Sequence, residues 1–115
     1  MILPRPGELK ESIDILNVRE PFDVNWVGTI VSKFAAGVRA KITPRGGDIV
    51  ESTQETQTAR QIYDVWIRYR EGVTAFQQID WGGRRLALTG PPEEIVRRKW
   101  LLVHAEELMD RKISQ

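Results

Sequence analysis

The stretch YDVWIRYREGVTAFQQIDWGGRRLAL, residues 63–88, decides the fold of this 115-residue chain. Its first part alternates between two sets of side chains, with Tyr63, Val65, Ile67 and Tyr69 on one side and Asp64, Trp66, Arg68 and Arg70 on the other. A period of two predicts a strand with one buried face. The alternation returns over 76–81 and over 84–89, and Gly82-Gly83 between them suits a tight hairpin because primed turns need positive φ. The stretch therefore predicts three consecutive antiparallel strands.

Further strands are predicted on both sides of this stretch. Residues 13–18 alternate near the start, residues 29–43 form a long strand with a predicted bulge at Ala35-Ala36-Gly37, and residues 99–105 form the last strand. Short strands in a meander are typical of small barrels and sandwiches, and closure removes exposed sheet edges. We expect a mainly β fold, a small antiparallel β-barrel of about six strands. Its predicted core combines residues of the last strand with Val65, Ile67, Ile79, Leu86 and Leu88.

The remaining segments are polar or rich in turn formers. Residues 1–10 contain two prolines and a glycine, so we expect a flexible N-terminal arm there. Residues 11–107 are then a single β-barrel domain, and residues 108–115 are a C-terminal tail. Residues 44–60 contain few apolar side chains, which predicts one long polar loop, or a short helix that Asp48 would cap.

Composition disfavours several classes of function. Cysteine is absent, which removes disulfides and thiolate chemistry and suits a reducing compartment. His104 is the only histidine, and no serine lies in a nucleophile-elbow context, so we expect no enzymatic activity, no cofactor and no metal site. We expect neither a secretory signal nor a membrane span. With 17 basic and 16 acidic residues, the net charge is only +1, which disfavours a dedicated nucleic-acid binder.

Trp66, Arg68 and Arg70 share the strand face opposite the predicted core, and three interpretations of this face stay open. Trp66 could simply shield the barrel wall with its rim exposed. The three residues could instead form a subunit interface, where Trp and Arg are enriched. In the third interpretation, Trp66 stacks on a base while the arginines bind phosphates, which would make the chain an oligonucleotide-binding-type barrel for single-stranded nucleic acid.

An ordered set of motifs spans most of the chain, from Ile13 to Glu107. An Ala-x-Ile-x-Pro motif over 40–44 is followed by Gly47-Asp48. The longest motif is Tyr-x-Val-x-Ile-Arg-Tyr-Arg-x-Gly-Val-Thr over 63–74, and a Gly-Arg-x-Leu hairpin follows over 83–86. In this order the motifs resemble the head–tail joining proteins of tailed bacteriophages, which are also called head–tail adaptor, head completion or stopper proteins.

The resemblance implies a structural virion protein without catalysis, assembled in the bacterial host cytoplasm as a homo-oligomeric ring of the connector beneath the portal. Its partners would be other copies of itself, a portal or adaptor protein on the head side and a tail-completion protein on the tail side. DNA would pass through the ring without sequence specificity, and the long loop would help to retain packaged DNA. The residues this implies for a channel or interface loop are Arg45, Asp48, Glu51, Glu55 and Arg60. The subunit-interface candidates are Trp66, Arg68 and Arg70.

Overall fold

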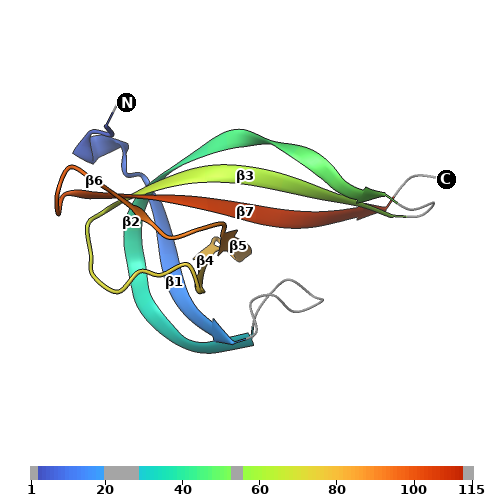
Figure 1. Ribbon diagram of the computed structural model, residues 1–115, viewed down its shortest axis with the longest axis horizontal. Coiled ribbons are helices and arrows are strands. Elements are labelled where there is room, and N and C mark those ends of the chain that lie inside the picture. The colour runs from blue at the N-terminus through green and yellow to red at the C-terminus, as the bar shows by residue number, and fades with distance from the viewer. Residues whose placement is uncertain (1–2, 20–28, 53–55, 113–115) are drawn as a thin grey trace.

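The computed structural model describes residues 3–19, 29–52 and 56–112, and most of them are in strands (Figure 1). The elements in chain order are η1 (Pro6–Glu8), a 3₁₀ turn, and the strands β1 (Glu11–Arg19), β2 (Thr29–Ser52), β3 (Thr56–Arg68), β4 (Gln77–Trp81), β5 (Arg84–Leu88), β6 (Glu93–Ile95) and β7 (Trp100–Lys112). The predicted mainly β fold class is confirmed.

Six of these strands close into an antiparallel barrel. The sheet order is β3-β2-β1-β4-β5-β7, and β3 pairs again with β7 to complete the circle. The short strand β6 pairs with β7 outside this circle, next to the start of β7. Closure gives most barrel strands two hydrogen-bonded neighbours, which removes the open edges that a flat sheet would expose.

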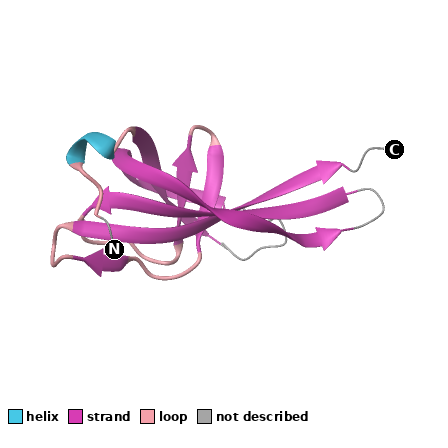
Figure 2. Cartoon of the chain, turned by 90° about the horizontal axis from the view of Figure 1, so that it is seen from above, coloured by secondary structure: helices cyan, strands magenta, loops and turns pink. Residues whose placement is uncertain are grey.

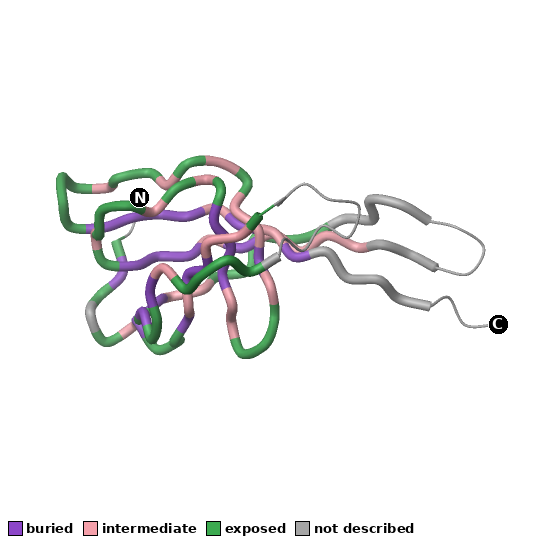
Figure 3. The backbone as a smooth tube through the Cα atoms, turned by 90° about the horizontal axis from the view of Figure 1, so that it is seen from below, coloured by how far each residue is buried: buried purple, intermediate pink, exposed green. Residues whose placement is uncertain are grey.

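The apolar side chains that alternate with a period of two in the sequence point inward and fill the barrel interior. The predicted core residues Val65, Ile67, Ile79 and Leu86 are buried, and Leu88 packs against them while partly buried. The other strands contribute Ile13, Ile15, Val38, Ala40, Leu101, Val103 and Ala105. In Figure 3 the buried positions lie along the barrel strands. Each large aliphatic side chain buried in this way stabilises the fold by about 1.5–3 kcal/mol relative to exposure.

Two local backbone features agree with the sequence. Gly82 and Gly83 both have positive φ, 59° and 86°, as a primed hairpin turn between β4 and β5 requires. The β1–β2 register shifts where Ile13 pairs with Val38 but Ile15 pairs with Ala35, which places the predicted bulge at Ala36-Gly37. Gly37 has a φ of 63° and donates its N–H to the Asp14 carboxylate at 2.9 Å.

The loop or short helix predicted for residues 44–60 is wrong. β2 continues as strand to Ser52 and β3 begins at Thr56, and the two pair along this length. The last strand, predicted to end at Ala105, also continues to Lys112 and pairs with the same part of β3. The physical reason is that a third strand satisfies the backbone hydrogen bonds, so strand structure does not need an apolar face here. The threonines of this segment also favour extended backbone.

As a result the molecule is elongated, with extents of 49 × 31 × 21 Å. Figures 1 and 2 show β2, β3 and β7 leaving the barrel together and running out to one end of the long axis. The turn between β6 and β7 lies at the opposite end (Figure 1).

Candidate assembly surface

The feature that distinguishes this barrel is the projecting sheet, which we call the arm and define as residues 43–52 of β2, 56–62 of β3 and 107–112 of β7. β3 is its central strand. β1 stops pairing with β2 at Ala40, and β5 stops pairing with β7 at Glu106. Among the described residues, nothing pairs with the outer edges of β2 and β7 beyond these points. The arm therefore presents two open strand edges, a template on which further strands can add.

An ion pair between the exposed Arg84 and the buried Glu107 connects the arm to the barrel at its root. The Arg84 guanidinium donates from Nε and Nη2 to the two carboxylate oxygens of Glu107, at 3.0 and 2.5 Å, and to the Tyr63 hydroxyl at 2.6 Å. It also lies 4.6 Å from the centre of the Trp81 ring. These hydrogen bonds to Glu107 raise the pKa of Arg84 further, although partial burial opposes them. Bidentate geometry of this kind fixes orientation, so β3, β5 and β7 are held together where the arm begins.

Close backbone contact also defines the root. A Cβ built on Gly47 would overlap the backbone carbonyl oxygen of Arg60 on the neighbouring strand. Gly47 pairs with Gln61 in the β2–β3 register. Only glycine fits here without moving one strand away from the other.

The residues predicted for a channel or interface loop are spread along the arm instead of converging. Arg45 forms an ion pair with Asp64 at 3.3 Å, and Arg60 approaches Glu106 at 3.7 Å. Asp48 lies directly opposite Arg60 in the strand register. Glu51 belongs to the described part of β2, whereas Glu55 lies outside the described residues.

The predicted interface face is only partly available. Trp66 is 8% exposed, because its ring packs edge-on against Trp100 with centroids 6.4 Å apart, and Leu9 and Leu102 complete the cluster. Trp66 therefore offers no free ring face on which a base could stack. Arg68 and Arg70 are exposed, and Arg68 lies 4.6 Å over the Trp100 ring. The signal in the sequence for this second cluster is Leu9, an isolated apolar residue among polar neighbours.

His104 lies between two carboxylates on the outer wall. Its Nδ1 is 2.8 Å from an Asp64 oxygen and its Nε2 is 3.0 Å from a Glu93 oxygen. Partial burial alone would lower the pKa of His104, but the hydrogen bonds and charges of Glu93 and Asp64 outweigh burial and raise that pKa above 6.5. The carboxylates flank opposite ring nitrogens, so they do not converge on one point. Sequence patterns could not have joined these residues, which come from three strands.

This bridge predicts a pH dependence of stability. Because the pKa of His104 is raised in the folded state, its stabilisation is fully present below the unfolded value of 6.5 and is lost as the pH rises through the folded value. The melting temperature of wild type should exceed that of His104→Gln most at about pH 6, and the gap should narrow by about pH 8. Differential scanning calorimetry of both proteins across this pH range measures the difference in melting temperature. A gap that stays constant with pH would contradict the bridge.

The described residues form neither a cluster of metal ligands nor a membrane-spanning helix. Within residues 3–19, 29–52 and 56–112, no group of three histidine, aspartate or glutamate side chains is arranged to hold a metal ion. Over the same described ranges, no helix has the length and apolar character needed to span a membrane.

Comparison with known proteins gives one family and a fold. The sequence model described as phage head completion protein matches residues 4–108. A chain in the virion of a native gene transfer agent particle is 16% identical, with a TM-score of 0.68, and the match covers 93% of this chain and 98% of that one. The solution structure of protein SF1141 from Shigella flexneri 2a is 21% identical, with a TM-score of 0.53 and coverage of 90% and 96%. No curated protein matches the sequence significantly.

Proposed function

The chain belongs to the phage head completion protein family, and from that membership we propose that it joins the phage head to the tail as one subunit of a ring in the connector. Membership makes it a structural component of the virion. The fold shared with a chain of a gene transfer agent virion supports the same setting. In this proposal the portal or an adaptor protein binds on the head side and a tail-completion protein binds on the tail side.

The observation that carries the ring proposal is the arm with its two open edges. The edges differ, since one belongs to β2 and the other to β7. A contact between the β2 edge of one subunit and the β7 edge of the next is heterologous, and heterologous contacts generate closed rings when the rotation between subunits closes. Strand addition supplies many backbone hydrogen bonds without requiring an apolar surface. The polar arm suits such a contact.

We place the candidate residues Arg45, Asp48, Glu51, Glu55 and Arg60 at this contact or facing the channel. This set contains two basic and three acidic side chains, so its net charge is only −1. A nearly neutral lining suits a channel through which DNA passes without sequence readout, because a strongly basic one would hold the phosphates. Arms that meet across the channel would also retain packaged DNA.

Gly47→Ala tests the proposal at the root of the arm. The added methyl group forces β2 away from Arg60 of β3, so the arm strands separate while the barrel core stays intact. Supplied from a plasmid to a phage lacking the wild-type gene, this variant should leave DNA-filled heads that do not carry tails. Negative-stain electron microscopy of the lysate counts these particles.

Gly90→Ala is the matched control, because a Cβ there meets nothing within 4 Å and the backbone is unstrained. This control should restore tailed particles. Circular dichroism of purified Gly47→Ala should still show a strand-rich protein. Normal tailing by a folded Gly47→Ala protein whose arm is separated would contradict the role given to the arm.

A further inference from the structure

The end of the barrel opposite the arm concentrates positive charge that the total composition hides. The N–H of Tyr69 donates to the Lys99 carbonyl at 3.0 Å, which brings the end of β3 against the turn between β6 and β7 (Figure 1). Five exposed cations meet there, and we call them the basic end: Arg68, Arg70, Arg97, Arg98 and Lys99. Among the described residues none of the five forms an ion pair, and only Glu71 and Glu94 lie near them in sequence.

The backbone that displays these cations is strained. Val96 and Arg98 have φ values of 56° and 59°, in the left-handed region that branched and long side chains rarely adopt. A hydrogen bond of 2.8 Å from the Lys99 N–H to the Val96 carbonyl closes the turn. Strain of this kind persists where the surrounding structure imposes it, and it clusters at functional positions. The turn therefore holds its cations outward at a conformational cost.

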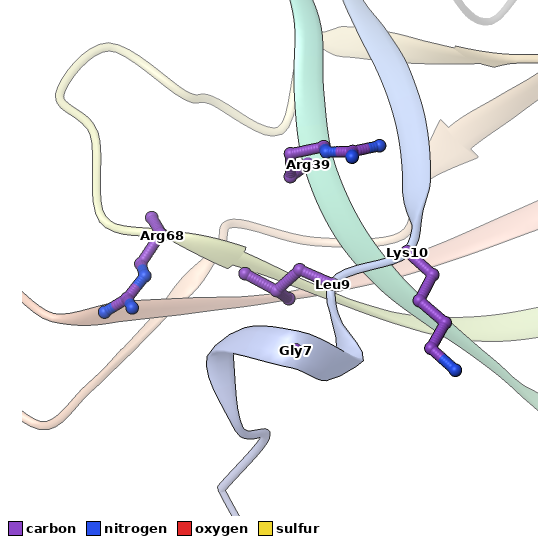
Figure 4. Close-up of a pocket in the computed structure, with 5 residues that line it drawn as sticks. All are labelled: Gly7, Leu9, Lys10, Arg39 and Arg68. Carbon is purple, nitrogen blue, oxygen red and sulfur yellow. The ribbon is translucent and has the colours of Figure 1, made fainter.

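A hollow lined in part by cationic residues lies beside the basic end. It measures about 530 Å³ and is lined by Gly7, Leu9, Lys10, Arg39 and Arg68. Figure 4 shows the three cationic side chains spread around Leu9 and coming from separate segments of the chain. Arg39 and Arg68 each lie one residue beyond the last pair of the β2–β3 register, Ala40 with Ile67. Both arginines line the hollow, and both are exposed.

We propose that this hollow and the basic end form the docking surface for an acidic segment of a neighbouring virion protein. The inference rests on the proposed place in the connector, where one end of each subunit must contact the next ring. Carboxylates pair well with arginine, and stacking on Trp100 at 4.6 Å already orients the Arg68 guanidinium. Leu9, which is mostly buried against Trp66 and Trp100, adds only a small apolar surface to the hollow. The net charge of only +1 disfavours DNA as the occupant.

Fluorescence anisotropy on the full chain tests the proposal with two labelled probes. One is a short peptide in which glutamate alternates with leucine, and the other is a duplex DNA of random sequence. The peptide should bind, and Arg39→Glu/Arg68→Glu should weaken its binding about tenfold or more. Arg19→Glu makes the same Arg→Glu reversal once, at an exposed position at the far end of β1, and should leave the affinity within about twofold, since solvent screens distant charges.

Three outcomes would overturn the proposal: no peptide binding, an equal loss of affinity in Arg19→Glu, or binding of DNA in preference to the peptide, which would assign the surface to nucleic acid. If the doubly reversed variant does not fold, Arg39→Gln/Arg68→Gln removes both charges without introducing repulsion. This variant must also bind the peptide more weakly than wild type does. Failure here leaves head–tail joining intact, because joining is measured in virions and does not depend on the peptide.

Discussion

Truncation of Ile67 to Ala should lower the free energy of unfolding by about 2–5 kcal/mol. Ile67 is 1% exposed and lies opposite Ala40 of β2 and Leu101 of β7, at the strand that closes the barrel. The interior around it leaves a void of only about 10 Å³, so the missing atoms create a cavity that neighbours on three rigid strands cannot fill. Domains of this size are stable by about 5–15 kcal/mol, so the loss is a large share of the total.

Ile30→Ala is the matched control, because it removes the same atoms from a side chain that is 50% exposed on β2. It should cost less than about 1 kcal/mol. Urea denaturation followed by tryptophan fluorescence measures both values, and the slope of the transition should stay unchanged in each variant. Equal costs for the two substitutions would mean that Ile67 does not lie in a packed interior.

The sequence predicted the barrel because its signals are local. Alternation over 63–70 decides which side chains face inward, and Gly82-Gly83 supplies the two positive φ values that the β4–β5 turn uses. This alternation predicts Val65 and Ile67 as core residues, and the alternation over 76–81 and 84–89 predicts Ile79, Leu86 and Leu88. All are buried except Leu88, which is partly buried. A short repeat of period two is visible in one strand without knowledge of its neighbours.

The arm could not be predicted in the same way. Residues 44–60 lack the apolar alternation that identifies a half-buried strand, and their polarity is typical of a loop. Their strand structure comes from pairing with β7, whose extension to Lys112 lies some fifty residues away and is equally polar. Backbone hydrogen bonding across three strands does not depend on the hydrophobic pattern of any one of them, so that pattern cannot predict it.

Contacts between residues far apart in the sequence also limit what could be predicted from the sequence. Trp66 shares a strand face with Arg68, which indicated an outward surface, yet Leu9 and Trp100 cover it. The pairing of Arg84 with Glu107 and of His104 with Asp64 likewise joins residues from different strands. Both the balanced composition and the small net charge concealed the basic end, because clustering depends on which turns meet in space.

A phage or prophage with a stop codon early in this gene should lose almost all infectious particles. The chain belongs to a family of structural virion proteins, and in the proposed role nothing else completes the contact between head and tail. DNA replication and packaging precede that contact, so they should proceed normally. Heads should fill with DNA, then lose it or remain without tails, and unattached tails should accumulate. Wild-type protein from a plasmid should restore infectivity.

Counting particles in such lysates by electron microscopy, together with nuclease protection of the packaged DNA, tests head–tail joining most directly. The account predicts normal numbers of heads, a wild-type amount of DNA packaged before any leakage, and free tails in excess over tailed particles. Empty precursor heads caused by failure to begin packaging, or a block in DNA replication, would contradict it.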